Sequence, residues 1–467
     1  MKYMLDPLRG NIFPVFFYYS FLTVIGMIAV SSASAVDAAF LGNKVGEMAL
    51  ATVNLSLPFV ILSGGIAYMM AIGASVNCGK YLGEGDPDTA SSIFTKTLLA
   101  TFVIAASISV IGRLGIDTLV TILGASPEIA PWVKKYLSML LLFIPFLTCG
   151  ICLSYFVRVD GRPLLAAASM VTGAGINISL DWLFVIKLNT GVQGAALATG
   201  LSQVALFSIL LPHFLLKKGK LRFKKNGGSW KEILFAAYNG FSEFANEISA
   251  GILTFIFNWI MIKRMGISGV AAYTIVNYIL YLGSMACYGI GDAIQPIISK
   301  NFGAEKSNRI SSFLLVAWGT VFLIGIGIIA LLVLVPDRMI DLFTNGEAGE
   351  TTRIAKEFIA YFWPAFLLIG VNIVFSSYFT AMQKPLHSAV VAISRSLALP
   401  AIFLMVLPLC LGTKGIYMAI PFAEVGTFLM SLKLFAPNKP LQLVRIDRLY
   451  KRQELFIKKE ISSSQYQ

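Results

Sequence analysis

The chain has 467 residues, of which 57% are hydrophobic and 13% are charged, whereas a soluble domain carries about 25% charged residues. A soluble fold of this length cannot bury so much apolar surface, so the composition excludes one and favours an integral membrane protein. Five cysteines are too few for a secreted disulfide scaffold, and the two histidines lie too far apart in the sequence to suggest a metal site.

Twelve apolar segments follow one another along the chain, each about as long as the 20 residues that a helix needs to cross a bilayer. They are roughly 13–39, 51–77, 93–113, 136–157, 164–188, 193–216, 231–262, 269–295, 310–335, 355–380, 386–411 and 413–435. None alternates with the period of two that a membrane barrel requires. The sequence therefore predicts an all-α integral membrane protein with twelve transmembrane helices. No cleavable signal peptide is expected, because the first apolar run is too long.

Basic residues gather in two segments outside the predicted spans, and these segments explain much of the formal net charge of +13. Seven lie between the sixth and seventh spans, from Lys217 to Lys231, and eight lie in the tail from Lys433 onward. Because loops rich in Lys and Arg stay in the cytoplasm, we expect a multi-pass protein of the cytoplasmic (inner) membrane with both termini inside. The tail either lies on anionic lipid as an amphipathic segment or stays solvated.

The two halves of the chain resemble each other at a nearly constant spacing. The matched positions are Gly46 with Gly266, Gly83 with Gly303, Ser154-Tyr155-Phe156 with Ser377-Tyr378-Phe379, and Gly194 with Gly415, at offsets of 220, 220, 223 and 221 residues. Two halves with the same topology are typical of transporters whose substrate path lies between them. We expect a six-helix lobe over 1–216, a basic cytoplasmic linker over 217–230, a second six-helix lobe over 231–435, and a basic cytoplasmic tail over 436–467.

Two carboxylates lie inside predicted spans of the first half, where charges are costly and usually functional. Asp37 is near the outer end of the first span, and Asp181 is on the fifth span with Asn177 one turn before it. Thr199 on the sixth span lies at a similar depth, so these four side chains can converge on one pocket. Such a pocket of oxygen ligands can bind Na⁺, or it can share a proton between the two acids.

The second half provides an internal control for these acids. The position aligned with Asp37 is near Asn258, and the position aligned with Asp181 falls in an apolar stretch around Ile402. The fold itself therefore does not require the two carboxylates. In the alternative, structural interpretation, Asp37 caps a turn and Asp181 makes an internal hydrogen bond.

The second half has its own charged positions inside spans: Glu243, Glu247, Arg395 and Glu424. The first two are one turn apart on the seventh span, and Arg395 is the one cation well inside a span. They predict either a substrate-binding or second polar cluster, or an ion-paired cluster between helices that is purely structural. Asp292, toward the cytoplasmic end of the eighth span, is expected to face a loop.

Several spaced motifs over about residues 10–435 resemble the multidrug and toxic compound extrusion (MATE) family. They are VDAAFLGNKVGEMALATVNLSLP, LGEGDPDTAS, NISLDWLFVIKLNTGVQGAALATGLSQ and GIGDAIQPIISKNFGAEK. The resemblance implies two six-helix lobes around a V-shaped cavity, and a cation pocket at Asp37, Asn177, Asp181 and Thr199. One feature departs from the pattern: some relatives bend the first span at a proline, whereas this span has Gly26 and no proline after Pro14.

The function that the resemblance implies is a secondary antiporter and not an enzyme. It would export cationic or amphiphilic small molecules in exchange for Na⁺ or H⁺, by alternating access, as a monomer among membrane lipids. We expect no cofactor besides the coupling ion, no metal beyond Na⁺ at Asp37 and Asp181, and no nucleic acid partner. The alternative is a flippase for lipid-linked oligosaccharides of the same superfamily. A membrane enzyme or channel is disfavoured, because the spans contain no nucleophile–base motif or phosphate-binding loop.

Overall fold

The computed structural model describes residues 5–224, 229–344 and 349–464, and all the regular elements among them are helices. The first half contains α1 (Ile12–Lys44), α2 (Glu47–Glu84), α3 (Pro87–Leu114), α4 (Ile116–Ile122), α5 (Ala130–Val159), α6 (Pro163–Asp181), η1 (Trp182–Lys187) and α7 (Gly191–Leu215). The second half contains α8 (Trp230–Gly303), α9 (Ser307–Leu334), α10 (Pro336–Thr344), α11 (Glu350–Phe362), η2 (Trp363–Ala365), α12 (Phe366–Ala381), α13 (Pro385–Ile393), η3 (Ser394–Ala398), α14 (Leu399–Leu411), α15 (Thr413–Phe435), η4 (Ala436–Asn438) and α16 (Pro440–Ser464). The predicted all-α fold is confirmed.

Within the described residues, eleven helical segments are long and apolar enough to cross a membrane. Their number differs from the twelve predicted spans because the seventh and eighth share α8, which is 74 residues long and kinked at Gly266. Gly266 has φ 65° and ψ −157°, and Gly46, which precedes α2, has φ 96° and ψ −169°. A positive φ favours glycine. This pair of repeat anchors therefore makes a similar turn after the first span of each half.

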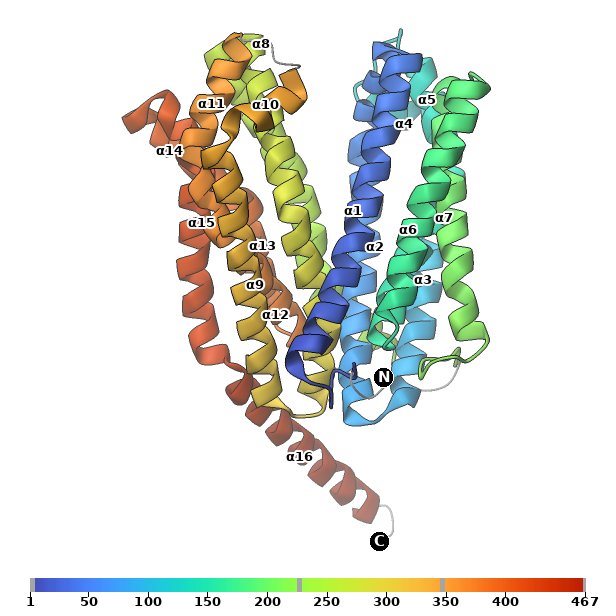
Figure 1. Cartoon of the computed structure of the whole chain (residues 1–467). Helices are drawn as coiled ribbons and strands as arrows, with labels where there is room; N and C mark the ends of the chain where they lie inside the picture. The colour runs from blue at the N-terminus through green and yellow to red at the C-terminus, as the bar shows by residue number, and fades with distance from the viewer. Residues whose placement is uncertain (1–4, 225–228, 345–348, 465–467) are drawn as a thin grey trace.

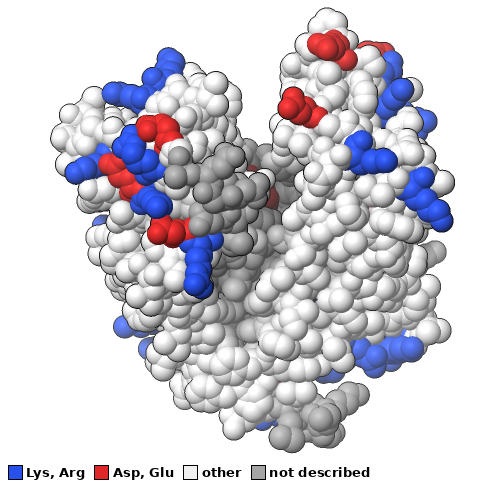
Figure 2. Space-filling view, turned by 45° about the horizontal axis from the view of Figure 1, so that its top comes forward, with Lys and Arg blue, Asp and Glu red and all other residues white. Residues whose placement is uncertain are grey.

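The helices gather into two bundles that stand side by side and diverge toward one end (Figure 1). We call α1–α7 the N-lobe and α8–α15 the C-lobe. The end that holds both termini is the inner end, and the opposite end is the outer end. The space-filling view shows the surface hollowed between the two lobes (Figure 2). The molecule thus has a cleft that opens away from its termini.

The basic segment after α7 is fastened to the inner end of the N-lobe as far as the structure describes it. The backbone N–H of Lys224 donates to Thr95 Oγ1 of α3 at 2.9 Å, and the Lys224 side chain pairs with Asp88 at 2.8 Å. Lys225 and the rest of 225–228 lie outside the described residues, as do the side chains of 454–464 in the predicted tail. The boundaries proposed for linker and tail stay predictions.

The lobes approach each other closely where α2 packs on α8. A Cβ atom on Gly83 would lie 2.1 Å from the carbonyl oxygen of Lys300, and a Cβ atom on Gly303 would lie 1.9 Å from that of Lys80. A side chain at either position would have to push the two backbones apart, because carbonyl groups of helices cannot move aside singly. This second pair of repeat anchors is therefore a contact between the lobes at the inner end.

The first span is one helix from Ile12 to Lys44. Gly26, which this span has in place of an internal proline, packs against α6: a Cβ atom there would lie 2.9 Å from Met170 Sδ. The small residue thus lets α1 approach α6. These two helices carry Asp37 and Asp181, so their close packing sets the geometry of the predicted cation pocket.

Candidate functional site

Asp181 is the last residue of α6 and lies directly before the π-helix η1. Its side chain is fully buried, and no hydrogen-bond donor among the described residues reaches either carboxylate oxygen. Oδ1 of Asp37 on α1 is also buried without a described partner. π-helical turns inside α-helices are frequently found at functional sites, because they shift the side chains of one turn out of register. Asp181 thus combines burial without a described hydrogen-bond partner with a position beside a π-helical turn.

The carboxyl groups of Asp37 and Asp181 lie near enough to each other to repel when both are charged. The hydroxyl group of Tyr136 on α5 is within electrostatic reach of both acids. A buried carboxylate without a hydrogen bond costs several kcal/mol, and two neighbouring ones cost more. The arrangement is therefore suited to take up a cation or a proton, either of which removes the repulsion.

The other two residues predicted for this pocket, Asn177 and Thr199, differ in their burial and in their relation to the acids. Asn177 is buried and lies one turn before Asp181 on α6, so it faces the same side of the helix. Thr199 is half-buried on α7, and the described residues show no hydrogen bond between its hydroxyl group and either acid. Sequence reasoning missed Tyr136, because it lies in an apolar run on a separate helix and only the fold places it beside the acids.

The charged residues predicted in the second half separate into two groups. Arg395 on the π-helix η3 pairs with Glu424 of α15 at 3.8 Å. It also donates to the hydroxyl oxygen of Tyr288 and, at 3.3 Å, to Asn246 Oδ1. Asn372 Nδ2 donates to Glu424 Oε2 at 2.7 Å. Both charges are thus held by hydrogen-bond partners, in contrast to those of Asp37 and Asp181.

A cavity of about 150 Å³ adjoins this pair. Arg395, Glu424, Tyr288, Ser284 and Asn277 are among the residues that line it. Its volume is smaller than the roughly 300–1,000 Å³ of pockets for drug-sized ligands. The cavity can hold a few water molecules or a small polar group, but not a whole drug.

Glu243 and Glu247 form the second group, together with Asp292. Gln295 Nε2 donates to Glu243 Oε1 at 3.5 Å, and the three carboxyl groups, all on α8, are within electrostatic reach of one another. The expectation that Asp292 faces a loop is wrong. It is 8% exposed, accepts a hydrogen bond from Tyr155 Oη, and lies 3.6 Å from Arg158 Nη1. The reason is that α8 runs on to Gly303, about three turns beyond Asp292.

The contacts of Asp292 join the lobes, because Tyr155 and Arg158 belong to α5 of the N-lobe. Only one signal in the sequence pointed to this contact between α8 and α5. Ser154-Tyr155-Phe156 is a repeat anchor, but the repeat alone does not say what Tyr155 touches. The structure thus places an acidic group of the C-lobe against a cation and a hydroxyl group of the N-lobe.

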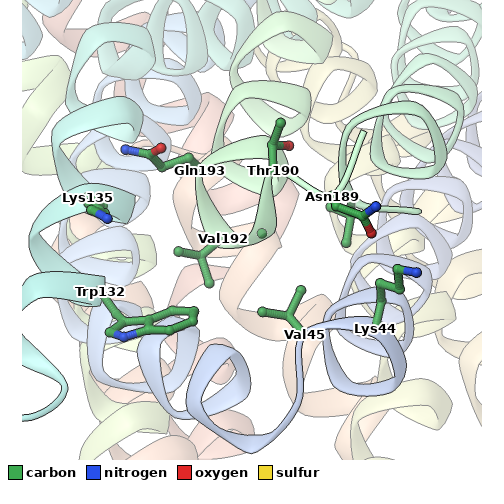
Figure 3. A pocket seen from close by; sticks show the side chains of 10 residues that line it. Lys44, Val45, Trp132, Lys135, Asn189, Thr190, Val192 and Gln193 are labelled. Carbon is green, nitrogen blue, oxygen red and sulfur yellow. The ribbon is translucent and has the colours of Figure 1, made fainter. Parts of the chain in front are cut away.

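A further pocket of about 380 Å³ lies at the outer end of the N-lobe. It is lined by Lys44, Val45, Trp132, Lys135, Val185, Asn189, Thr190, Gly191, Val192 and Gln193. Figure 3 shows the Trp132 ring, Val45 and Val192 directed toward its middle, with the lysine side chains at its margin. Trp132 is one turn from Tyr136 on α5, and Val185 is one turn from Asp181. The pocket therefore lies just outward of the two acids.

Within the described part of the chain, three or more His, Cys, Asp or Glu side chains do not come together in a group that could hold a metal ion. A cation at the two acids would thus complete its coordination with amide, hydroxyl or water oxygens. Na⁺ accepts such mixed oxygen ligands.

Comparison with known proteins agrees with this architecture. The family model described as MatE matches residues 23–183 and again residues 246–406. The second match begins 223 residues after the first, which agrees with the repeat inferred from the anchor positions.

Relatives and solved structures match over nearly the whole chain. A FAD transporter of Shewanella oneidensis is 23% identical over 86% of this chain and 89% of its own. The multidrug export protein MepA of Staphylococcus aureus is 21% identical over 89% of this chain and 92% of its own. An outward-facing structure of a multidrug resistance MATE family transporter superposes with a TM-score of 0.88 at 22% identity, over 95% of this chain and 99% of that one. A transporter of Pyrococcus furiosus, from the MOP superfamily, gives 0.86 at 22% identity, over 93% and 98%. The chain belongs to the MATE family of membrane transporters.

Proposed function

We propose that the protein is a secondary antiporter that exports cationic or amphiphilic small molecules in exchange for Na⁺ or H⁺. The observation that carries the proposal is a pair of neighbouring acids: Asp181, buried with both carboxylate oxygens unpaired among the described residues, and half-buried Asp37, whose Oδ1 is buried without a described partner. Two neighbouring carboxylates without partners in a membrane protein are stable only with a cation or a proton between them. The export of drugs by the relative MepA supports the direction of transport.

The mechanism follows from the position of the acids within one lobe. A cation at Asp37 and Asp181 draws α1 and α6 together, and it thereby favours one arrangement of the lobes over the other. The cleft that opens at the outer end then releases its substrate (Figure 2). If both termini are cytoplasmic, as the basic segments indicate, this cleft faces the outside of the cell. The half-buried Glu243 and Glu247 give the inter-lobe region a negative charge that suits cationic substrates.

Transport by proteoliposomes under an imposed Na⁺ gradient, and separately under a pH gradient, tests the proposal with a fluorescent cationic dye as substrate. We expect one of the two gradients to drive dye transport in the native chain. Asp37→Asn and Asp181→Asn should abolish the response. The matched control Asp117→Asn breaks an exposed ion pair with Lys134 in the same lobe and should leave transport unchanged. A response to neither gradient, or full transport by folded Asp181→Asn, would contradict antiport at this site.

A second candidate substrate is FAD or a similar anionic cofactor. The FAD transporter of Shewanella oneidensis favours it, and so does Arg395, the guanidinium group that lines the C-lobe cavity. Glu424 largely balances that charge at 3.8 Å, so the cavity lacks the net positive charge that a pyrophosphate group requires. Efflux of FAD from loaded vesicles, with Arg395→Met as the variant, separates this candidate from the export of cations.

A further inference from the structure

The helix α16 follows the C-lobe and passes below both lobes at the inner end (Figure 1). It is connected covalently to the C-lobe, through η4 after α15. Leu443 and Val444 are buried on one side of it, whereas Leu441, Leu449 and Tyr450 are exposed. A solvated tail would have no buried side, so α16 is docked on the protein along its first turns.

Two ion pairs join α16 to α2 of the N-lobe. Asp447 Oδ1 lies 2.7 Å from Lys80 Nζ, and Lys451 Nζ lies 2.8 Å from Glu84 Oε1. Each helix places its two charges one turn apart, an acid and a base on each. The pattern matches in only one register, so the contact is specific. Lys451 also pairs with Asp447 Oδ2 at 2.9 Å, which links the two pairs into one network.

The network is partly shielded from solvent. The side chains of Lys80 and Asp447 are 16% and 15% exposed. Burial raises the pKa of Asp447, but hydrogen bonds and the charges of Lys80 and Lys451 outweigh it, and the pKa is lowered overall. Burial lowers the pKa of Lys451, but the hydrogen bonds and charges of Glu84 and Asp447 have the larger effect. The pKa of Lys451 is therefore raised overall. Both groups thus keep their charges in the docked helix.

Further contacts fix α16 to the C-lobe, and another joins Lys80 of α2 to the C-lobe. Arg448 Nε donates to Glu305 Oε2 at 2.6 Å. Lys80 Nζ also donates to Gln383 Oε1 at 3.2 Å, and Gln383 Nε2 donates to Asn77 Oδ1 of α2 at 2.8 Å. Because Gln383 belongs to the C-lobe and Asn77 to the N-lobe, these bonds cross between the lobes at the same end as α16.

We propose that α16 is a strap that holds the two lobes together at the inner end and must release α2 before that end can open. Alternating access, on which this inference rests, requires the inner ends to separate. α16 moves with the C-lobe, so separation breaks Lys80–Asp447 and Glu84–Lys451. The strap therefore stabilises the arrangement whose cleft opens outward, and the strength of its ion pairs sets how often the inner end opens.

The distance between spin labels across the inner end of the full-length protein measures this opening. Labels attach at Leu216→Cys on the N-lobe and Asn308→Cys on the C-lobe, both exposed positions. The exposed Cys410 is replaced by serine, and the four buried cysteines are left in place. The measurement needs neither substrate nor an ion gradient, so its outcome is independent of whether the protein exports drugs.

Charge reversal and charge exchange make the test specific. Glu84→Lys places two lysines against each other, and we expect the ratio of inner-open to inner-closed molecules to rise about fivefold or more. Exchange of the pair, Glu84→Lys with Lys451→Glu, should lower that ratio again. Asp337→Asn is the matched control, because it breaks the Lys356–Asp337 ion pair within the C-lobe, and it should leave the ratio unchanged.

Other results overturn the strap. One is an unchanged distance distribution both in Glu84→Lys and in a chain that ends at Lys439. Another is a rise of the inner-open to inner-closed ratio in Asp337→Asn that equals the rise in Glu84→Lys. It would show that any surface charge change loosens the lobes. A third is failure of the exchanged pair to lower the ratio, which would mean that the Glu84–Lys451 contact does not itself hold the lobes.

Discussion

The two lobes treat their buried charges in opposite ways. In the N-lobe, Asp37 and Asp181 lie close together, and the described residues offer no hydrogen bond to either oxygen of Asp181. In the C-lobe, Arg395 and Glu424 neutralise each other, and Asn372, Asn246 and Tyr288 bond to them. Both arrangements adjoin a π-helix, η1 in the N-lobe and η3 in the C-lobe.

The difference indicates which lobe has an unneutralised charge that can bind an ion or a proton. A satisfied ion pair between helices fixes its side chains and gains nothing from an added ion. An unsatisfied acid pair gains a large free energy from a cation or a proton. From this difference between similar scaffolds, built from a repeated sequence, we expect the Arg395–Glu424 cluster to hold helices of the C-lobe together and the N-lobe pair to be the coupling site.

The largest expected effect is that of Asp181→Asn on transport. Loss of one partner of a buried charge contact costs about 2–5 kcal/mol, so the coupling cation should bind at least about 30-fold more weakly. The thermal midpoint of unfolding should not fall, because the variant removes a carboxylate that lacks a hydrogen-bond partner. Transport by proteoliposomes and thermal unfolding in detergent, measured on the same preparation, check both parts. A variant that transports normally but unfolds earlier would make Asp181 a structural residue.

Glu424→Leu, by contrast, should lower the thermal midpoint of unfolding. It leaves the guanidinium group of Arg395 buried without its counter-charge, and such a loss costs about 3–5 kcal/mol of stability. The double variant Arg395→Met with Glu424→Leu should recover most of that loss, because it removes both charges. Thermal unfolding of the native chain, Glu424→Leu and the double variant measures the loss and its recovery. If Glu424→Leu unfolds at the native temperature, the contrast between the lobes is wrong.

The sequence was sufficient to predict the fold because its signals are local or periodic. Long apolar segments define the helices, and the anchors Gly46 and Gly266 are glycines because each has a positive φ. Gly83 and Gly303 are glycines because another backbone lies against them. Spacing alone therefore revealed the repeat, although the physical reasons differ between the two pairs.

The candidate site was only partly predictable, because its contacts join helices that lie far apart in the sequence. Asp37 and Asp181 stand out as charges in apolar runs, but nothing in the sequence places Tyr136 beside them. The partner of Arg395 could not be chosen among three glutamates without the packing of α15. Asp292 was misplaced for the same reason, since its partners Tyr155 and Arg158 lie on the other lobe.

Gly303→Ala should have a smaller effect, and it tests whether the close contact of the lobes matters. The added methyl group would lie 1.9 Å from the carbonyl oxygen of Lys80, and such overpacking costs about 1–3 kcal/mol. Since the contact exists only when the inner end is closed, the label pair at that end should report more open molecules. Gly319→Ala on α9 is the matched control, because its Cβ atom would meet no atom within 4 Å. An equal rise in open molecules in Gly303→Ala and Gly319→Ala would show that the effect comes from replacing a helical glycine in general and not from the contact between the lobes.

The smallest effect concerns pH, and it separates the paired charges of α16 from the unpaired acids of the N-lobe. The pKa of Asp447 is lowered in the docked helix, so its contribution is present above the ordinary aspartate pKa of about 3.9. That contribution is lost only as pH falls through the lower pKa of the docked state. The inner-end label distance should therefore stay constant from about pH 7 to pH 5 and lengthen only in stronger acid. Asp447→Asn should reduce the acid response, because Asp447 is one of the carboxylates that hold α16. A change near pH 6 that persists in Asp447→Asn would assign control of the inner end to other groups, the acid pair of the N-lobe among them.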